Sequence, residues 1–272
     1  MRNILDEIVA WKIEEVESAK AQLSVRDLER LPGFKRPPVS LRGHLLDPGK
    51  YGIIAEFKRR SPSKGDIHKN ADVLHVTQGY VAAGASALSV LTDQHFFGGT
   101  NADLEIARSG NTCPILRKDF TIDPYQILEA KAIGADAILL IAACLGKKQL
   151  RSLAQLAKSL GLDVLLEVHD RTELDHWNEY VDIIGVNNRN LKTFDVSIQT
   201  SIDLLEEMPA GSVCISESGI NDPAVIVDLR QRGFRGFLIG ENFMADDFPG
   251  EKCRAFIERV RVLDELTKNA IA

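Results

Sequence analysis

The sequence lacks paired cysteines and long apolar runs. Its 272 residues include only four cysteines, which lie far apart without a CxxC pair: Cys113, Cys144, Cys214 and Cys253. Such cysteines are typical of a reducing compartment. The longest apolar run, 137–145, falls short of the roughly 20 residues that a membrane-spanning helix needs. Because the N-terminus also carries acids every few positions, unlike a secretory signal, we expect a cytoplasmic protein without membrane contact.

The charge and the motif content exclude further classes of function. The formal net charge is −6 and no basic block is present, which argues against nucleic acid as a partner. No HxH, HExxH or cluster of acids has the spacing of metal ligands, and no GxGxxG follows the first predicted strand. We therefore predict neither a metal nor a cofactor. A small anionic ligand is compatible with an acidic chain, since a local group of Lys and Arg can bind it.

One alternation repeats from residue 51 onward: a short apolar run, a turn and a helical stretch. Successive runs begin roughly 20–35 residues apart, as strands of βα units do. We predict strands at 51–58, 85–92, 113–118, 135–142, 163–168, 182–187, 212–217 and 236–240. Eight units favour an α/β fold that closes as a (β/α)₈ TIM barrel, and a miscounted strand would leave an open doubly wound sheet as the alternative.

The first 50 residues lie outside this alternation. Apolar residues at helical spacing predict an amphipathic helix whose apolar face carries Ile4, Leu5, Ile8, Val9, Ile13 and Val16. A second short helix is predicted at 24–31, and LPGFKRPP (31–38) is predicted to be an extended linker. We expect residues 1–50 to form an N-terminal helical extension that caps one end of the barrel, and residues 51–272 to form the barrel, with one domain overall.

Charged residues interrupt the first predicted strand. Side chains alternate between the two faces of a strand, so Glu56 and Lys58 lie on the same face as Ile54. In a barrel, the ends of the strands and the following loops form the active face. Other polar residues at predicted strand ends are Lys118, Glu167, Asn187, Glu217 and Glu241. Because a barrel would bring these ends into one pocket, we predict an active site there.

Glycines follow the last two predicted strands. SESGI (216–220) and FLIGE (237–241) place Gly219 and Gly240 in loops that commonly present backbone N–H groups to a phosphate in barrels. The alternative is that both glycines only permit tight turns. We predict a phosphate site at these loops.

Other residues near the predicted strand ends have two readings. Phe97 and Phe120 follow the second and third strands, so they either belong to the core or wall an aromatic ligand pocket. His169 follows Glu167 by two positions, and we interpret it as a residue at the start of a helix or on the surface, not as a metal ligand.

Seven segments, in this order and context, resemble the indole-3-glycerol phosphate synthase family over nearly the whole chain. They are IIAEFKRRSPSKG (53–65), LSVLTDQHFFGG (88–99), PILRKDF (114–120), LLEVHD (165–170), IGVNNRNL (184–191), ISESGI (215–220) and FLIGENFM (237–244). The resemblance implies a TIM-barrel carboxy-lyase of tryptophan biosynthesis. Its reaction would convert 1-(2-carboxyphenylamino)-1-deoxy-D-ribulose 5-phosphate to indole-3-glycerol phosphate, with loss of CO2 and water.

The resemblance also implies catalytic roles, position by position. Lys118 would be the general acid that protonates the ketone oxygen of the substrate. Lys58 would pair with the substrate carboxylate and share acid work in dehydration, and Glu167 would be the base or proton shuttle of that step. The remaining catalytic residues would orient the lysines and the substrate hydroxyls, or support that orientation: Glu56, Asn187, Ser218 and Glu217.

Substrate-binding residues are implied in the same way. The phosphate would bind Ser61, Arg189, Gly219, Gly240 and the backbone N–H of Glu241, and the pocket of the anthranilate ring would be lined by Phe97, Phe120 and Leu238. Because a carboxylate repels a phosphate, we expect the Glu241 side chain to turn away. The implied partner is this small phosphorylated substrate, and we expect a monomer or a weak homo-oligomer.

The chemistry accounts for the residue types independently of the family. Decarboxylation and dehydration both need proton donors at neutral pH, and we expect crowding by a second lysine to lower the pKa of a catalytic lysine. The iminium form of the substrate serves as the electron sink, so the reaction requires no cofactor.

Three alternative functions are retained. A sister barrel, phosphoribosylanthranilate isomerase, would use a Cys and Asp pair at strand ends, where this chain has Lys and Glu. A Schiff-base lyase would use Lys118 or Lys58 as a nucleophile. A non-catalytic barrel would bind a phosphate ligand without turnover.

Overall fold

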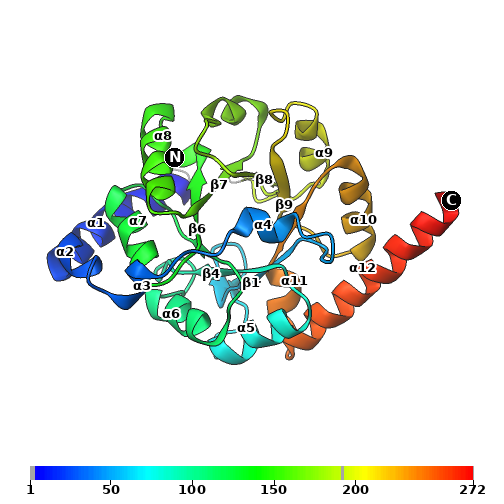
Figure 1. Cartoon of the computed structure of the whole chain (residues 1–272), viewed down its shortest axis with the longest axis horizontal. Coiled ribbons are helices and arrows are strands. Elements are labelled where there is room, and N and C mark those ends of the chain that lie inside the picture. The colour runs from blue at the N-terminus through cyan, green and yellow to red at the C-terminus, as the bar shows by residue number, and fades with distance from the viewer. Residues whose placement is uncertain (1–3, 191–192, 272) are drawn as a thin grey trace.

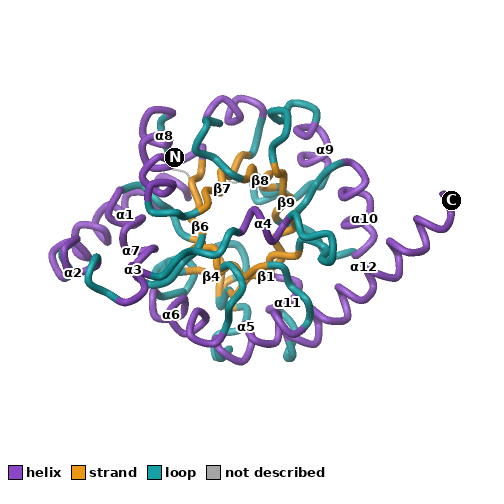
Figure 2. The backbone as a smooth tube through the Cα atoms, viewed as in Figure 1, coloured by secondary structure: helices purple, strands orange, loops and turns teal. Residues whose placement is uncertain are grey.

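Eight parallel strands close into a barrel in the computed structural model, which describes residues 4–190 and 193–271 (Figures 1 and 2). Around the barrel the order is β1, β4, β5, β6, β7, β8, β9, β10 and back to β1. The bounds are β1 Ile53–Phe57, β4 Ala87–Leu91, β5 Ile115–Lys118, β6 Ala137–Ile141, β7 Asp163–Val168, β8 Ile183–Asn187, β9 Val213–Glu217 and β10 Gly236–Ile239. Each strand lies inside a predicted range, so the predicted barrel is confirmed and the open sheet is excluded.

Strand β1 shows how alternating side chains build the barrel. Ile54 packs in the apolar cluster inside the barrel, and Glu56 lies on the same inward face nearer the carboxyl end, next to Ser89 of β4 in the register. Ile53 and Phe57 belong to the outer apolar cluster, between the strands and the surrounding helices. The barrel interior is therefore apolar toward the amino ends of the strands and polar at their carboxyl ends.

Helices follow the strands and cover the outside of the barrel (Figure 2). They are α5 Val73–Ala82, α6 Asn101–Gly110, α7 Pro124–Ala132, α8 Lys147–Ser159, α9 Gln199–Leu205, α10 Pro223–Arg232, α11 Glu241–Met244 and α12 Pro249–Ile271. Local chemistry sets their ends. The Asp123 side chain accepts the N–H of Tyr125 at the start of α7, and Gly233, with φ of 126°, ends α10. At the start of α7 the side-chain oxygen accepts a backbone N–H that has no partner within the helix. At the end of α10 the left-handed φ is one that glycine adopts at little conformational cost.

Three loops depart from the simple βα unit. A 3₁₀ helix, η1 (Ala142–Cys144), follows β6, and a second one, η2 (Arg171–His176), takes the place of an α-helix after β7. After β1, a small antiparallel hairpin joins β2 (Arg60–Ser61) to β3 (Gly65–Asp66). These loops follow the carboxyl ends of their strands, so they border the site described below.

Residues 4–50 of the N-terminal extension form four helices: α1 Ile4–Gln22, α2 Val25–Leu28, α3 Pro32–Lys35 and α4 Leu41–Leu45. The predicted extended linker at 31–38 is wrong, because α3 lies within it. Pro32 occupies the first turn of α3, where the N–H that proline lacks would have no partner within the helix.

The extension contacts both ends of the barrel. Leu41 and Leu45 of α4 join the apolar cluster inside the barrel and close its amino end, and in Figure 1 α4 lies over the centre of the ring. At the carboxyl end, Leu5 and Ile8 of α1 line a cavity. Helix α4 therefore closes the amino end of the barrel interior, and α1 borders its carboxyl end.

The buried face of α1 differs from the predicted face. Ile8 is buried, as predicted, but Ile13 is 53% exposed. Lys12 is fully buried, and its Nζ lies 2.9 Å from carboxylate oxygens of Asp93 and Asp119. Hydrophobic periodicity misses this residue because a lysine counts as polar and its partners lie far away in the sequence.

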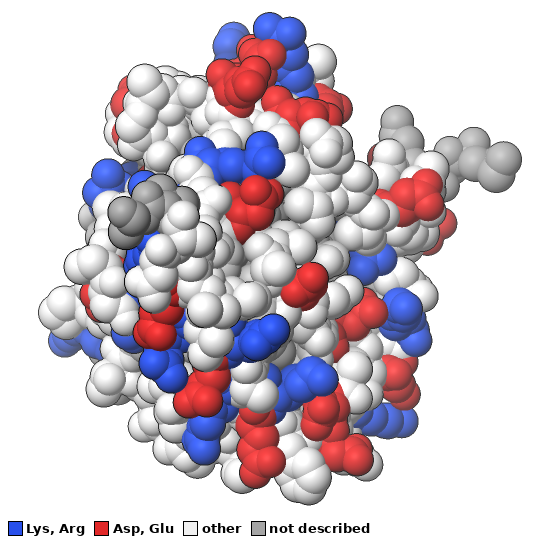
Figure 3. All heavy atoms as spheres, turned by 90° about the vertical axis from the view of Figure 1, so that its right-hand side faces the viewer, with Lys and Arg blue, Asp and Glu red and all other residues white. Residues whose placement is uncertain are grey.

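The surface carries charges of both signs. On the face drawn in Figure 3, Lys and Arg alternate with Asp and Glu. That face therefore offers no continuous basic track of the kind that binds a nucleic-acid backbone. Within residues 4–190 and 193–271, no helix combines the length and the apolar composition that crossing a membrane requires.

Candidate active site

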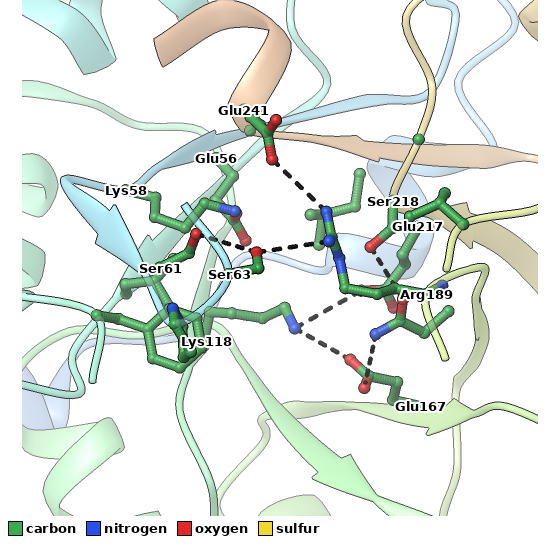
Figure 4. Close-up of a pocket in the computed structure, with 18 of the residues that line it drawn as sticks. Glu56, Lys58, Ser61, Ser63, Lys118, Glu167, Arg189, Glu217, Ser218 and Glu241 are labelled. Carbon is green, nitrogen blue, oxygen red and sulfur yellow. Dashed lines mark hydrogen bonds and ion pairs between the residues drawn. The ribbon is translucent and has the colours of Figure 1, made fainter. Parts of the chain in front are cut away.

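A cavity of about 650 Å³ opens at the carboxyl ends of the strands. Every residue that the sequence predicts for the site lines it: Glu56, Lys58, Ser61, Phe97, Lys118, Phe120, Glu167, Asn187, Arg189, Glu217, Ser218, Gly219, Leu238, Gly240 and Glu241. Figure 4 shows the charged members pointing toward a common centre. The barrel thus brings together residues as far apart in the sequence as Glu56 and Glu241.

Two glycines make room for carboxylates at the base of the cavity. A Cβ on Gly240 would overlap Oε1 of Glu56, and a Cβ on Gly185 would overlap Oε1 of Glu217. Only glycine therefore lets the neighbouring strand place a carboxylate at these two points. The shape of the site depends on both glycines, although Gly185 carries no chemistry.

Lys118 lies at the base of the cavity among acids. Its Nζ is 3.0 Å from Glu167 Oε2 and 3.7 Å from Glu217 Oε2. Burial alone would lower the pKa of this ammonium, but the carboxylates of Glu167, Glu217 and Glu56 outweigh burial and raise the pKa above its ordinary value. The expectation that a second lysine lowers this pKa is therefore wrong, because the neighbours of Lys118 are acids.

The two acids beside Lys118 differ in protonation. Burial raises the pKa of Glu217, Lys118 opposes that effect, and the charges of Glu167 and Glu56 add to it, which brings the pKa from 4.5 to about 8. Oε1 of Glu217 is also buried without a hydrogen-bond partner among the described residues. At Glu167, the Lys118 ammonium outweighs burial and lowers the pKa. At neutral pH one of these two carboxyl groups is therefore neutral and the other is ionised, an arrangement suited to acid–base chemistry.

A chain of hydrogen bonds holds Glu167 in place. Asn187 Nδ2 donates to Glu167 Oε1 at 3.1 Å, and Ser218 Oγ donates to Asn187 Oδ1 at 2.9 Å. The backbone N–H of Arg189 donates to the same Oδ1 at 3.0 Å. Ser218 has a φ of 70°, a left-handed conformation that residues other than glycine adopt at a cost. Backbone strain of this kind is typical of functional sites, and the hydroxyl of the strained Ser218 points to Asn187.

Glu56 and Lys58 form an ion pair on the inward face of β1. Lys58 Nζ lies 2.7 Å from Glu56 Oε1, and Ser89 Oγ donates to Glu56 Oε2 at 3.4 Å. The Glu56 side chain is buried, whereas that of Lys58 is 16% exposed at the cavity. The ammonium is therefore held by one acid and stays accessible to a ligand.

Two aromatic rings wall one side of the cavity. The ring centroids of Phe97 and Phe120 lie 5.9 Å apart. The backbone N–H of Phe97 donates to Asp93 Oδ1 at 3.2 Å, and that of Phe120 donates to Asp119 Oδ1 at 2.8 Å. Both aspartates pair with the buried Lys12 of α1. One charge cluster thus joins α1 to the aromatic wall.

Cations and hydroxyls surround the mouth of the cavity. Arg189 Nη1 lies 3.5 Å from Ser63 Oγ, which in turn lies 3.5 Å from Ser61 Oγ. Helix α11 begins on the same side, and its N-cap, Gly240, provides no side-chain cap for the first N–H groups. Hydroxyls, a guanidinium and free N–H groups are the donors that a phosphate accepts from.

Glu241 points into the mouth. Its Oε1 lies 3.5 Å from Lys64 Nζ and its Oε2 lies 3.5 Å from Arg189 Nη2, as Figure 4 shows for the arginine. The expectation that this side chain turns away is therefore wrong, because two cations attract it.

Residues outside the predicted set also contact its members, among them Ser63, Lys64 and His169. Ser63 and Lys64 line the cavity, and only their place after β1 hinted at it. His169 does lie at the start of a helix, η2, but it is not a surface residue: its side chain is 12% exposed, with Nε2 3.4 Å from Glu167 Oε1. A signal was available, since the residue two positions after Glu167 shares its face of the strand.

The described residues do not favour metal binding or a reactive thiol at this site. Within them, no group of three or more His, Cys, Asp or Glu side chains is arranged to hold a metal ion. The cysteines are free, and burial raises the pKa of the Cys113 and Cys214 thiols. Such thiols stay protonated and are poor nucleophiles.

Comparison with known proteins identifies relatives along almost the whole chain. The family model described as indole-3-glycerol phosphate synthase matches residues 5–256. The indole-3-glycerol phosphate synthase of Bacteroides thetaiotaomicron is 48% identical over 262 residues, which cover 96% of this chain and 100% of that protein. That of Bordetella pertussis is 45% identical over 257 residues, covering 92% of this chain and 97% of that protein.

Comparison with solved structures identifies a likeness of fold. A chain of the tryptophan synthase α2β2 complex from Pyrococcus furiosus matches with a TM-score of 0.58 and 12% identity, over 78% of this chain and 98% of that chain. At this identity the likeness concerns the barrel alone. The family model, in contrast, extends over every residue that the sequence predicts for the site. The chain belongs to the indole-3-glycerol phosphate synthase family.

Proposed function

We propose that this chain carries out the reaction of its family, converting 1-(2-carboxyphenylamino)-1-deoxy-D-ribulose 5-phosphate to indole-3-glycerol phosphate with loss of CO2 and water in tryptophan biosynthesis. The observation that carries the proposal is the Lys118 ammonium, 3.0 Å from Glu167 at the base of an enclosed cavity. A cation and an ionised acid in contact can give and take protons without another group. The aromatic wall and the cationic mouth suit the two ends of this substrate.

Lys118 acts in ring closure. It donates a hydrogen bond and then a proton to the ketone oxygen, while the ring carbon that bears the carboxylate forms a bond to the ketone carbon. The developing alkoxide is a stronger base than the Lys118 amine, so the proton moves even though neighbouring acids raise the pKa of this lysine. An ammonium fixed in advance also stabilises the developing negative charge. Ring closure leaves an iminium at the aniline nitrogen.

Two losses complete the indole. The bond to the carboxylate breaks as CO2 leaves, and its electron pair returns to the ring and neutralises the iminium. Lys58, held 2.7 Å from Glu56, pairs with the substrate carboxylate beforehand and then protonates the departing hydroxyl. Glu167, oriented by Asn187 at 3.1 Å, accepts the proton from the neighbouring carbon as the second double bond forms.

The two ends of the substrate bind to different walls. The anthranilate ring lies against Phe97, Phe120 and Leu238. The phosphate lies at the mouth, where its donors are Ser61, Arg189 and the backbone N–H groups of Gly219, Gly240 and Glu241. The Glu241 carboxylate has to leave Arg189 when the phosphate binds, since two anions repel each other there.

The test is a direct assay. The purified protein, mixed with the carboxyphenylamino deoxyribulose phosphate, should produce indole fluorescence and release CO2 in equal amounts. Equal amounts matter because decarboxylation without dehydration would release CO2 but leave a non-aromatic five-membered ring. A protein that binds this compound, as seen by calorimetry, but gives neither product would be a binding barrel and would contradict the proposal.

Two rival reactions have separate signatures. Treatment with borohydride during turnover would attach substrate to a lysine if Lys118 or Lys58 formed a Schiff base, and we expect no label. An isomerase would instead consume phosphoribosylanthranilate and form the compound that we propose as substrate. Buried thiols with raised pKa values disfavour that reaction, since it would need a reactive Cys beside an Asp.

We further propose that the enzyme works in the cytoplasm as a monomer or a weak homo-oligomer. The free cysteines support the compartment. Sedimentation at micromolar concentration measures the assembly state.

A further inference from the structure

Asn188 directly follows β8, and its side chain lies on the side of the barrel wall opposite to the cavity. The preceding Asn187 lines the cavity, and successive side chains of an extended chain point to opposite faces. Asn188 is 2% exposed, and its side chain contacts two fully buried serines, Ser201 of α9 and Ser216 of β9. It therefore touches neither end of the proposed substrate.

These three side chains close a ring of hydrogen bonds. Asn188 Nδ2 donates to Ser216 Oγ at 2.9 Å, and Ser201 Oγ donates to Asn188 Oδ1 at 2.8 Å. The two serine oxygens lie 2.7 Å apart, and because Ser201 has already given its proton to Asn188, Ser216 is the donor between them. The direction of the ring thus fixes which end of the Asn188 amide carries the N–H groups. One hydrogen of Nδ2 is left for another acceptor.

That hydrogen goes to the end of β9. Asn188 Nδ2 donates to the backbone oxygen of Ser218 at 3.1 Å, and the backbone N–H of Asn188 donates to the backbone oxygen of Glu217 at 2.9 Å. Together with the ring, these bonds hold three consecutive residues, 216–218. Two of the three, Glu217 and Ser218, line the cavity.

The Ser218 carbonyl sets the direction of the N–H that follows it. In a trans peptide the carbonyl and the N–H point to opposite sides. Because the Ser218 oxygen is turned to the buried Asn188, the N–H of Gly219 is turned to the cavity, which Gly219 lines. Ser218 itself has a φ of 70°, a conformation that costs free energy in serine and persists only where its surroundings hold it.

We propose that Asn188 is a positioning residue that fixes the peptide between Ser218 and Gly219 and thereby serves both halves of the site. This inference rests on the proposed function, in which the Gly219 N–H binds the phosphate and Glu167 is the base. At the mouth, the N–H is in place before the phosphate arrives, which favours binding. At the base, the Ser218 hydroxyl keeps Asn187 oriented toward Glu167. Without Asn188, the peptide is free to turn and to present its carbonyl oxygen to the phosphate.

A buried asparagine outside the cavity provides the matched control. Asn111 is 7% exposed, and its Nδ2 donates to Thr77 Oγ1 at 3.1 Å and to the backbone oxygen of Ala107 at 2.7 Å. Asn188 likewise donates to one hydroxyl and one carbonyl. Alanine at either position removes the same two kinds of hydrogen bond, so the loss of stability should be similar, and only the change at Asn188 should reach the site.

The first measurement is the binding of inorganic phosphate, followed by calorimetry, which needs no turnover. Asn188→Ala should raise the Kd about tenfold or more, the value of one hydrogen bond to a charged group. Asn111→Ala should leave the Kd within about twofold. In the assay of indole formation, kcat should fall about tenfold to a hundredfold in Asn188→Ala alone, because Glu167 loses its orientation. Equal phosphate affinity and equal kcat in the two variants would overturn the inference.

Ser218→Ala separates the two effects of Asn188. It removes the hydroxyl that orients Asn187 and keeps the peptide, so kcat should fall while the phosphate Kd stays within about twofold. In the double variant with Asn188→Ala, kcat should stay within about threefold of the lower single variant, because both changes act through one hydroxyl. The phosphate Kd should still rise about tenfold. Losses of kcat that multiply would show that Asn188 does not act through Ser218 and would contradict the proposal.

Ser201→Ala is the milder test if Asn188→Ala does not fold. It opens the ring but leaves Asn188 its bond to Ser218, so the phosphate Kd should rise and kcat should fall by about threefold each, the value of a neutral hydrogen bond. An unchanged Kd and kcat in this variant would refute the inference. An inactive parent enzyme would instead refute the proposed function, and the phosphate titration would still decide whether Asn188 fixes the peptide.

Discussion

Two lysines, Lys12 and Lys118, lie among acids but in different geometry. At both, acids outweigh burial and raise the pKa. Lys12 is sealed, with carboxylate oxygens of Glu15, Asp93 and Asp119 each 2.9 Å from its Nζ. Lys118 is 16% exposed at the cavity and has one such oxygen at 3.0 Å and another at 3.7 Å. An ammonium has three N–H groups, so Lys12 has none to spare, whereas Lys118 keeps one for a ligand.

The acids of the two clusters differ as well. Burial would raise the pKa of Asp119, but Lys12 and Arg117 outweigh it and lower the pKa, so the Lys12 cluster is a fixed set of charges. The cluster at the cavity contains Glu217, whose pKa is raised to about 8. One cluster therefore holds the chain in place, and the other stores a proton that can move near neutral pH. Because Asp119 directly follows Lys118, the fixed cluster also positions the reactive one.

The comparison predicts its largest effect at the reactive lysine. Lys118→Ala removes the donor to the ketone oxygen, so kcat should fall by roughly 10²–10⁴, the usual contribution of a general acid. KM should change little, because ring and phosphate contacts are kept. Steady-state indole fluorescence measures both constants. A variant with near-normal kcat would end the assignment of Lys118.

The second effect is on stability. Lys12→Met leaves the buried Asp93 without its cation and Asp119 with Arg117 alone, which should cost about 3–5 kcal/mol in the free energy of unfolding. Urea unfolding followed by fluorescence measures this cost. The first turnover of the folded fraction should change less than tenfold, since Lys12 does not contact the substrate.

The matched control for Lys12 is the next residue on α1. Ile13 is 53% exposed, so Ile13→Ala should change the free energy of unfolding by no more than about 0.5 kcal/mol. If Lys12→Met were as mild as this control, or if its kcat fell as far as that of Lys118→Ala, the division into a holding and a reacting lysine would be wrong.

The same contrast explains what the sequence predicts well and what it misses. The strands and the polar residues at their ends follow from local alternation, and Lys118 is one of them. Lys12 is invisible to this reasoning, because its burial depends on Asp93 and Asp119 from distant loops. The same holds for the pKa of Lys118: the sequence places two lysines near the site, but the three-dimensional arrangement surrounds this one with acids.

Two other differences between the predicted and the observed side chains, at Glu241 and His169, have the same cause. Glu241 turns toward the mouth because Lys64 and Arg189, which are distant in sequence, attract it. His169 had a local signal in its spacing from Glu167, but its orientation depends on Glu173 across the turn. Tertiary electrostatics thus decides the orientation of side chains whose position local patterning already gives.

The smallest predicted effect concerns the proton that Glu217 holds in the cluster around Lys118. A group whose pKa is higher in the folded protein contributes stability that is fully present below its unfolded pKa and is lost as the pH rises through the folded pKa. For Glu217 this window runs from 4.5 to about 8. Glutamine imitates the protonated form at every pH, so Glu217→Gln should remove this loss. At pH 7 we expect it to raise the free energy of unfolding by roughly 0.5–2 kcal/mol, a usual size for a stabilising substitution.

The pH course of this gain distinguishes the stored proton from simple repacking. The advantage of Glu217→Gln over the parent protein should be absent near pH 4, grow between pH 4.5 and 8, and stay constant above pH 8, as measured by urea unfolding at each pH. Glu14→Gln, at an exposed glutamate of α1, is the matched control and should change stability by less than about 0.5 kcal/mol throughout. A gain independent of pH would mean that Glu217 is ionised in the folded protein. The cluster at the cavity would then be as fixed in charge as the one around Lys12, and access alone would separate the two lysines.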